Sequence, residues 1–281
     1  MAEIIRGRLL AKKIQEKAAA QISKMENPPG LAAILVGGDK ASHLYVSLKE
    51  KAAKEVGIYF EKIEFPADAK DKTIVQAVQK LNKRDDIHGI LVQLPLKEQN
   101  EDKIIAAIDP AKDVDGFHPV NRERLLAGEP SLVSPVALAI LRLIAETRQP
   151  LRDKTAVIVS NNEIFALPII ELMKEQGIVG TFVARDSGGI EAKLRAADII
   201  VVAVGKLNFL SKDMVKEGAI VIDVGTNKAR SGRLVGDAMK EVKQVAAFKS
   251  PVPGGVGPLT VAYLLNNVMK AALMKKQNAQ E

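Results

Sequence analysis

The sequence contains no cysteine and no tryptophan, and aromatic residues make up only 4% of its 281 residues. Without cysteine, the chain forms no disulfide framework, cysteine-ligated zinc site, iron–sulfur cluster or thiol nucleophile. The shortage of aromatics removes most stacking platforms for single-stranded nucleic acid. No apolar run reaches the ~18–20 residues of a membrane-spanning helix, and the first residues show no secretory signal. We therefore expect a cytoplasmic protein without a membrane partner.

Charge of one sign is only modestly in excess. The chain has 41 Lys and Arg against 34 Asp and Glu, a net charge of +7, and the two signs are interspersed without a long basic stripe. Nucleic acid is therefore not expected as a partner, whereas an anionic small molecule is. The three histidines are scattered without ligand spacing, so no metal site is expected. The length and the 47% hydrophobic content predict two globular domains.

Two kinds of sequence pattern alternate along the chain. Charged, Ala- and Leu-rich stretches with helical spacing cover residues 8–26 and 41–56. Short β-branched runs lie between such stretches and are typical of parallel strands buried on both faces. These runs are residues 31–36, 58–65, 87–92, 156–159, 180–184, 199–204 and 219–224. The pattern predicts an α/β fold built from βαβ units.

A domain boundary is expected near residues 128–153. Loop residues around Gly128 precede Ser134-Pro135, which is typical of a helix start, and the chain restarts at Thr155 with the plan of a dinucleotide-binding unit. We predict a first domain at residues 1–135, joined by a C-terminal helix at 259–281, and a second domain at residues 136–258.

Polar segments at two predicted strand ends suggest a reactive centre. Tyr45 and Lys49 are spaced i, i+4 and so share a helix face, where a phenol and an amine can polarise a bound group and relay a proton. Gln93 follows a buried strand and offers both a donor and an acceptor. The plain alternatives are a core tyrosine beside a solvated lysine, and a glutamine that caps a turn.

Two further loops carry chemistry. Asp113 and Asp115, two residues apart before Gly116, suggest either a metal site or loop capping, and the plain alternative for at least one of them is an Asx-type turn. Residues 250–258 are rich in proline and glycine, so this stiff loop lets a ligand approach the main chain closely. The loop also opens the last helix, whose N-terminus favours anionic groups.

These four segments, in this order and at these spacings, resemble the bifunctional 5,10-methylenetetrahydrofolate dehydrogenase/5,10-methenyltetrahydrofolate cyclohydrolase family, often called FolD. The resemblance runs from Ile5 to about Ala272. It implies an N-terminal α/β catalytic domain, a Rossmann-type parallel-sheet domain and a deep cleft between them. It also implies a homodimer, with a β-hairpin at residues 227–237 as a candidate contributor, and a role in the one-carbon metabolism that serves purine biosynthesis.

The resemblance assigns roles to residues that match the family pattern. Lys49 would be the central acid/base of the cyclohydrolase step, in which water attacks the methenyl carbon of a cationic folate. Tyr45 would position the folate, Gln93 would support Lys49, and Asp115 would hold the amino edge of the pterin. The remaining folate-binding residues it implies are Val92, Leu94, Pro253, Gly254, Gly255, Val256 and Gly257.

The dinucleotide half departs from the family pattern. Where the family has Gly-Arg-Ser after the first strand of this half, the chain has Ser160, Asn161 and Asn162. Without glycine, which permits positive φ and close contact, backbone approach to a diphosphate is expected to suffer. Arg185 would meet the 2′-phosphate of NADP, or Asp186 would accept the ribose hydroxyls of NAD, or both are solvated loop residues. Thr226 completes the candidate cofactor residues.

Three hypotheses remain open at this point. The chain keeps both activities with NADP, or with NAD, through altered contacts. Alternatively it is a cyclohydrolase only, with a dinucleotide domain retained for structure. The third hypothesis is a folate-binding paralogue without turnover, against which the intact Lys49, Gln93 and Asp115 argue.

Overall fold

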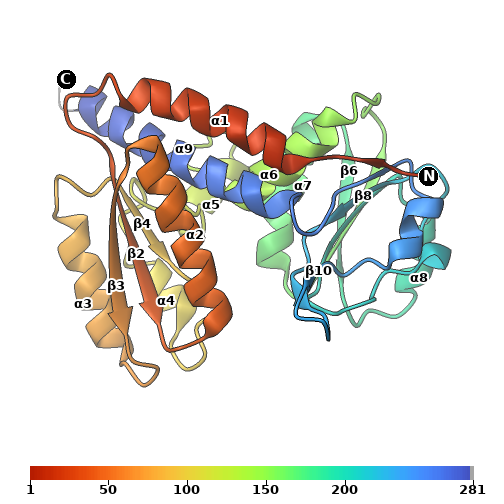
Figure 1. Ribbon diagram of the computed structural model, residues 1–281, viewed down its shortest axis with the longest axis horizontal. Helices are drawn as coiled ribbons and strands as arrows, with labels where there is room; N and C mark the ends of the chain where they lie inside the picture. Colours follow the sequence, from red (N-terminus) through yellow and green to blue (C-terminus); the bar gives the residue numbers. More distant parts are fainter. Residues whose placement is uncertain (279–281) are drawn as a thin grey trace. The chain divides into compact units, whose positions relative to one another are not determined.

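A computed structural model describes residues 1–278 and is shown in Figure 1. The chain forms two compact units. The six-stranded unit comprises Met1–Ala11 and Val136–Thr260, and the three-stranded unit comprises Lys12–Pro135 and the residues from Val261 onward. Helices α1 (Gly7–Ile22) and α9 (Val256–Asn278) have residues in both units.

The three-stranded unit is built on a parallel sheet with the order β3-β2-β4. Its strands are β2 (Gly30–Val36), β3 (Tyr59–Phe65) and β4 (Gly89–Val92). Its further helices are α2 (Lys40–Val56), α3 (Asp71–Asn82), α4 (Glu101–Ile105) and α5 (Pro119–Leu126). The predicted strands at 31–36, 58–65 and 87–92 are therefore confirmed, each within a few residues of its expected ends.

The position of strand β2 explains why its sequence is a continuous apolar run. Its side chains alternate between faces: Leu31 and Leu35 join a core with α1, α2 and α9, while Ile34 joins a core with α3 and α4. Helices α2 and α3 accordingly lie on opposite faces of the sheet (Figure 1). Burial on both faces removes the polar alternation of a half-exposed strand.

Both ends of helix α2 are fixed by local chemistry. The Asp39 side chain accepts a hydrogen bond from the Ser42 amide at 2.8 Å and so caps the N-terminus. Gly57, with a φ of 87°, ends the helix in the left-handed conformation that glycine adopts without strain. These caps define the helix that carries Tyr45 and Lys49 on one face.

The six-stranded unit is a parallel sheet with the order β1-β11-β8-β7-β5-β6. Its strands are β1 (Glu3–Ile4), β5 (Thr155–Ser160), β6 (Val179–Ala184), β7 (Ile199–Ala203), β8 (Ile220–Asp223) and β11 (Phe248–Lys249). Its helices are α6 (Pro135–Glu146), α7 (Glu163–Glu175), α8 (Ile190–Ala196) and the short 3₁₀ segments η1 (Lys212–Met214) and η2 (Lys240–Gln244). A two-stranded hairpin, β9 (Asn227–Lys228) and β10 (Leu234–Val235), completes the unit.

The strand order identifies a doubly wound sheet. Counted from β5, the strands lie in the order second, first, third, fourth, fifth, which is one of the two common doubly wound arrangements. Connections leave β5 in opposite directions across the sheet, so the switch point lies between β5 and β7. Ligands of such sheets bind beyond the carboxyl ends of these two strands.

Two features of this unit were not expected. Residues Glu3–Ile4 pair with Phe248–Lys249 at the sheet edge, so the first residues of the chain fold with the six-stranded unit. Helix α9 begins at Val256, three residues before the predicted start, so Val256 and Gly257 form its first turn. Residues 279–281 of the predicted last helix lie outside the described residues.

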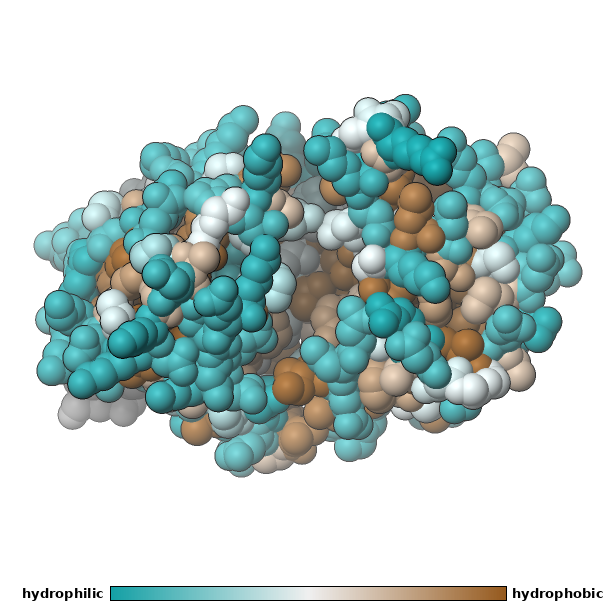
Figure 2. Space-filling view, turned by 90° about the horizontal axis from the view of Figure 1, so that it is seen from below, coloured by the Kyte–Doolittle hydropathy of each residue, from teal (hydrophilic) through white to brown (hydrophobic). Residues whose placement is uncertain are grey.

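The face shown in Figure 2 is covered mostly by hydrophilic side chains. On the face shown in Figure 2, hydrophobic residues appear only in small groups between hydrophilic ones. Within residues 1–278, no helix has both the length and the apolar composition that crossing a bilayer requires.

Candidate active site and dinucleotide-binding edge

Lys49 and Gln93 meet in the three-stranded unit. Lys49 lies in the middle of α2, and Gln93 directly follows β4. The Lys49 Nζ donates a hydrogen bond to the Gln93 Oε1 at 3.0 Å, and the Gln93 Nε2 donates to the Leu94 carbonyl at 2.8 Å. The amide is thus locked with its oxygen toward the amine, which fixes the position of the lysine head group. Tyr45, one turn before Lys49, is half-buried.

The two acids before Gly116 have different surroundings. Asp113 is buried, and its Oδ2 accepts hydrogen bonds from the His118 amide at 2.8 Å and the Asn121 Nδ2 at 2.9 Å. Asp115 is half-buried and accepts no hydrogen bond from the described residues. Asp113 therefore ties the loop together, while the oxygens of Asp115 are available to a ligand.

Electrostatics couple Asp115 to the lysine. Burial raises the pKa of the Asp115 carboxyl, and the charge of Lys49 offsets part of this rise. The loop bends sharply at Gly116, which has a φ of 69°, and a Cβ there would lie 2.6 Å from the Ser134 amide nitrogen. Only glycine fits this turn, which places Asp115 close enough to Lys49 for their charges to interact.

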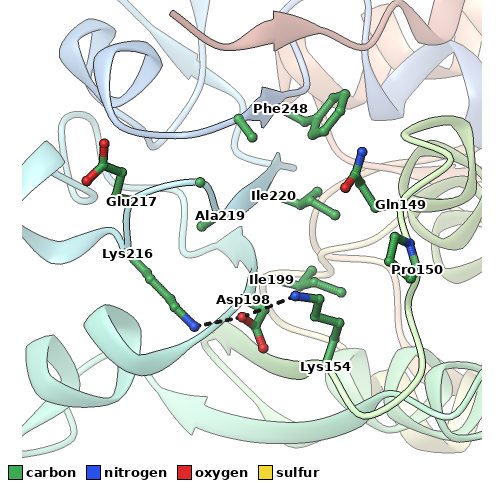
Figure 3. A pocket seen from close by; sticks show the side chains of 12 residues that line it. Gln149, Pro150, Lys154, Asp198, Ile199, Lys216, Glu217, Ala219, Ile220 and Phe248 are labelled. Atoms are coloured by element: carbon green, nitrogen blue, oxygen red, sulfur yellow. Dashed lines mark hydrogen bonds and ion pairs between the residues drawn. The ribbon is translucent and has the colours of Figure 1, made fainter.

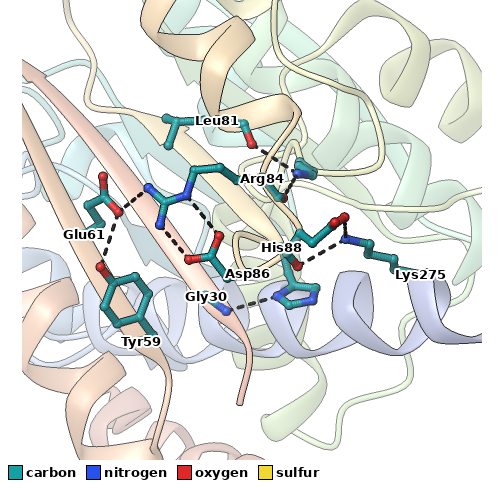
Figure 4. Close-up of polar contacts among 10 residues, drawn as sticks. Gly30, Tyr59, Glu61, Leu81, Arg84, Asp86, His88 and Lys275 are labelled. Carbon is teal, nitrogen blue, oxygen red and sulfur yellow. Dashed lines mark hydrogen bonds and ion pairs between the residues drawn. The ribbon is translucent and has the colours of Figure 1, made fainter. Parts of the chain in front are cut away.

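Lys112 attaches the loop of Asp113 and Asp115 to the end of helix α3. Its Nζ donates to the carbonyl oxygens of Leu81, Asn82 and Arg84 at 3.1, 2.8 and 2.7 Å, at the C-terminal end of α3. Figure 4 labels two of these acceptor residues, Leu81 and Arg84. Its own carbonyl accepts from the Ile90 amide at 2.8 Å, so the chain before Asp113 runs alongside β4. Desolvation by burial lowers the pKa of Lys112, and Lys275 lowers it further.

The proline- and glycine-rich loop lies in the six-stranded unit. Gly254 has a φ of 105°, and its carbonyl accepts from the Arg8 amide at 3.0 Å. A Cβ at Gly255 would lie 2.6 Å from the Pro251 oxygen, so this position requires glycine. Pro253 and Gly257 are exposed, whereas Val256 is buried as the first residue of α9. A role of this loop in folate binding stays a prediction.

The turn after β5 forms without glycine. No residue of Ser160–Asn162 has a positive φ, so the turn forms in a conformation that does not require glycine. The expectation that backbone approach to a diphosphate suffers stays a prediction. Ser160 is buried and its Oγ donates to the Asn162 carbonyl at 2.6 Å, while the Asn162 side chain accepts from the Phe165 amide at 3.1 Å and caps α7. The turn is closed by its own side chains.

The loop after β7 places further polar groups beside the turn after β5, at the carboxyl ends of these two strands. The Asn161 Nδ2 donates to the Val204 carbonyl at 3.3 Å and joins the loops that follow β5 and β7. Lys206 is exposed in the second loop, and a Cβ at Gly205 would meet nothing within 4 Å. An open backbone, a lysine and the N-terminus of α7 form a donor set that fits the phosphates of a dinucleotide.

Arg185 and Asp186 follow β6 and pair with each other. The Arg185 Nη2 lies 3.2 Å from the Asp186 Oδ2, and this hydrogen bond lowers the pKa of Asp186. The Arg185 amide donates to the Ser160 carbonyl at 3.2 Å, so the pair is attached to the turn after β5. Thr226 is exposed just beyond β8. Their contact with a cofactor stays a prediction.

A cavity lies at the amino ends of the strands of the six-stranded sheet, away from the predicted dinucleotide site at their carboxyl ends. It lies at the amino ends of β7, β8 and β11, where Asp198 meets Lys154 and Lys216 (Figure 3). Burial favours the neutral Asp198, but hydrogen bonds from Lys216 and Thr155 outweigh it and lower the pKa to about 2. The carboxylate is saturated by its own chain, and doubly wound sheets bind ligands at the other end. We therefore assign this cavity a structural role.

The fold and these sites define a two-domain α/β enzyme with a doubly wound nucleotide-binding unit. Residues 5–115 match the family model "Tetrahydrofolate dehydrogenase/cyclohydrolase, catalytic domain", and residues 134–276 match "Tetrahydrofolate dehydrogenase/cyclohydrolase, NAD(P)-binding domain". The chain belongs to the tetrahydrofolate dehydrogenase/cyclohydrolase family, which confirms the resemblance.

Individual relatives match over nearly the whole chain. The bifunctional protein FolD of Streptococcus pyogenes serotype M5 is 42% identical over 279 residues, covering 97% of this chain and 98% of the relative. The crystal structure of the bifunctional FolD enzyme of Campylobacter jejuni superposes with a TM-score of 0.93 at 36% identity, covering 98% and 100% of the two chains. The Trypanosoma brucei FolD structure, complexed with NADP and an inhibitor, has a TM-score of 0.93 at 34% identity, covering 98% and 99%.

Proposed function

We propose that the chain catalyses both reactions of its family. It oxidises 5,10-methylenetetrahydrofolate to 5,10-methenyltetrahydrofolate, and it hydrolyses the latter to 10-formyltetrahydrofolate. Full-length similarity to bifunctional relatives supports both activities. The observation that carries the proposal is the Lys49–Gln93 hydrogen bond of 3.0 Å, together with the carboxylate of Asp115, which has no hydrogen-bond donor among the described residues and lies in electrostatic range of the lysine.

The cyclohydrolase step requires a base at a defined position. Water forms a bond to the methenyl carbon, a C–N bond of the bridge breaks, and one proton passes from the water to the departing nitrogen while another is released. Lys49, in its amine form, takes the proton from the attacking water and returns it to that nitrogen. Gln93 accepts one N–H of Lys49, which aims the nitrogen lone pair away from the amide.

Asp115 and Tyr45 serve to orient the folate. The amino edge of a pterin is rich in N–H donors, and a carboxylate accepts two such bonds at once. Asp115 suits this role because no described residue donates a hydrogen bond to it. Tyr45 shares the helix face of Lys49 and offers a flat ring against the pterin. Val92 and Leu94 flank Gln93 and complete this side of the site.

The dehydrogenase step needs NADP, with NAD as the alternative. When bound, the nicotinamide would supply the acceptor for the hydride that leaves the methylene carbon. The phosphates would be held by the first turn of α7 and by Lys206, and the 2′-phosphate by Arg185. Asn161 brings no charge to this edge, and this observation favours the second candidate, a cyclohydrolase that has lost its dehydrogenase.

Assays of the purified full chain separate these candidates. We expect hydrolysis of methenyltetrahydrofolate well above the rate in buffer, and reduction of NADP or NAD by methylenetetrahydrofolate. Hydrolysis without reduction of either nucleotide selects the cyclohydrolase-only candidate. Tight folate binding with neither turnover contradicts the proposal and selects a non-catalytic binding protein.

A matched pair of lysine variants tests the base. Lys49→Met should lower the hydrolysis rate by about 10²-fold or more, as expected for removal of a general base. Lys51→Met, on the same helix with its side chain 75% exposed and 3.9 Å from Glu55, should leave the rate unchanged. Equal rates for both variants would remove Lys49 from the mechanism.

We further propose a cytoplasmic homodimer without nucleic-acid partners. The interspersed charges and the family resemblance support this proposal, and the β9–β10 hairpin is the candidate contact. Sedimentation velocity of the full chain, with Leu234→Ser in the hairpin as the variant, tests it. A monomer at micromolar concentration would contradict the dimer.

A further inference from the structure

Two aspartates are buried beneath the loops that follow β7 and β8. Asp223 is the last residue of β8, and Asp237 follows the hairpin strand β10. Their side chains are 2% and 0% exposed. Neither belongs to a segment that the sequence pattern assigned to chemistry, and buried carboxylates are retained only where hydrogen bonds satisfy them.

Asp237 binds three consecutive backbone amides. Its Oδ2 accepts from the Val204 and Gly205 amides at 2.7 and 3.1 Å, and its Oδ1 accepts from the Lys206 amide at 3.0 Å. The Asn227 Nδ2 adds a fourth bond at 2.8 Å. Consecutive amides that converge in this way form an anion-binding concavity. Here the chain's own carboxylate fills it and fixes the loop after β7.

Asp223 has the corresponding role at the end of the neighbouring strand, β8. Its Oδ1 accepts from the Gly225 amide at 3.1 Å and from the Asp237 amide at 2.9 Å, and its Oδ2 accepts from the Ala238 amide at 3.0 Å. Asp223 therefore fixes the segment that carries Asp237. Burial raises the pKa of Asp223, and the bonds from Ala238 and Asp237 counteract this rise.

Two glycines interlock the aspartates. A Cβ at Gly225 would lie 2.2 Å from the carboxyl carbon of Asp237, and a Cβ at Gly236 would lie 2.0 Å from the Asp223 Oδ2. Each carboxylate thus fills the space beside a glycine that neighbours the other aspartate. Any side chain at either glycine displaces a carboxylate from the amides that it holds.

The loop that Asp237 holds is the one at the switch point of the sheet. Residues 204–206 follow β7, and Asn161 from the turn after β5 donates to the Val204 carbonyl. Gly205 and Lys206 are exposed, so this side of the loop is open to a ligand while the other side is bound to Asp237. One side of the loop at residues 204–206 is therefore hydrogen-bonded to Asp237, and the other side is exposed to solvent.

We propose that Asp237 is a positioning residue for the nicotinamide dinucleotide, acting through the Val204–Lys206 loop, and that Asp223 and Gly225 hold Asp237 in place. The nature of the ligand rests on the proposed function. The hold on the loop rests on the hydrogen bonds alone.

The test compares Asp237→Asn and Gly225→Ala with Asp213→Asn, the same chemical change at an exposed position of this unit. NADPH binding is followed by the fluorescence of the nucleotide, and hydrogen exchange is followed at residues 204–206. An asparagine side chain cannot accept at both atoms, so at least one of the three loop amides loses its partner. We expect the dissociation constant for NADPH to rise about tenfold or more in the first two variants, as for loss of one charge-assisted hydrogen bond. Exchange at residues 204–206 should accelerate, and the hydrolysis rate should stay within about twofold of the wild type.

Each of the other outcomes contradicts a specific claim. Wild-type NADPH affinity in Asp237→Asn, or a hydrolysis rate that falls in parallel with binding, overturns the positioning role, because a general loss of structure would affect both activities. A wild-type chain that binds neither NADPH nor NADH contradicts the proposed dehydrogenase instead. In that case faster exchange still confirms the hold on the loop, and unchanged exchange overturns it.

A milder variant covers a failure to fold. Asn227→Ala removes one of the four hydrogen bonds to Asp237 and leaves its carboxylate in place. We expect a smaller rise in the NADPH dissociation constant, about two- to fivefold, with an unchanged hydrolysis rate. An unchanged dissociation constant in this variant would overturn the proposal.

Discussion

The loop before Gly116 carries two acids whose substitution should have opposite consequences. Asp113→Ala removes the acceptor of two buried donors, the His118 amide and the Asn121 Nδ2. A buried donor without a partner costs about 1–3 kcal/mol, and the burial that raises the pKa of Asp113 offsets part of this cost. We expect the free energy of unfolding to fall by about 2–4 kcal/mol.

Asp115→Ala should spare stability and impair folate binding. No described residue donates to Asp115, and burial raises its pKa, so its removal relieves an unfavourable burial of charge. The free energy of unfolding should change by less than about 1 kcal/mol. Loss of the charge-assisted hydrogen bonds to the pterin, each worth about 1.5–3 kcal/mol, should raise the KM for methenyltetrahydrofolate at least about tenfold.

Urea denaturation and hydrolysis kinetics on the same two variants decide the matter. Asp113→Ala that is still folded at low urea should raise KM less than Asp115→Ala does, because the Asp113 carboxylate is enclosed by the loop and acts on the folate only through it. The reasoning is refuted if Asp115→Ala is the less stable variant. It is equally refuted if Asp113→Ala raises KM as much as Asp115→Ala does.

Three further predictions follow from the same geometry. Lys112→Met should lower the free energy of unfolding by at least about 2 kcal/mol, because three carbonyls at the end of α3 lose their donor. Urea denaturation checks this, with Lys83→Met at an exposed position as the control. Equal stabilities of the two variants would contradict the prediction. Folate binding needs ionised Asp115, so folate affinity should fall as the pH drops through the pKa of Asp115, which is raised above the ordinary 3.8. In Lys49→Met this loss of affinity should begin at a higher pH, because the positive charge that favours ionisation of Asp115 is gone. A folate-binding titration that shows the same pH dependence in both proteins would contradict the coupling. Asn161→Arg should raise NADP affinity about tenfold relative to NAD, and an unchanged ratio in nucleotide titrations would exclude this position from 2′-phosphate binding.

The sequence predicts the long strands well because burial on both faces leaves a pattern. Residues 31–36 show that pattern, and both cores meet at β2. The strands β1 and β11 escape prediction because each has two residues, too few for any periodicity. Their pairing joins residues more than two hundred positions apart, which only the tertiary structure specifies.

Among the active-site residues, too, local spacing can be predicted from the sequence, whereas contacts that depend on tertiary packing cannot. The spacing of Tyr45 and Lys49 on a helix is readable from sequence, but the contact between Lys49 and Gln93 depends on how α2 packs on the sheet. Asp223 and Asp237 carry a signal that was overlooked, since each lies within two residues of a glycine. An acid beside a glycine is usual in exposed turns, so sequence alone does not reveal burial.

The turn after β5 shows which property of the family pattern its substitutions change. Ser160, Asn161 and Asn162 all adopt negative φ values, so the turn does not need the conformational freedom of glycine. The turn is instead closed by the Ser160 hydroxyl and the Asn162 cap. What the substitutions change is therefore charge, because Asn161 cannot neutralise a phosphate. Survival of the dehydrogenase consequently depends on whether the lysine and arginine at the neighbouring strand ends, Lys206 and Arg185, supply that charge, and Arg185 must first leave Asp186 to do so.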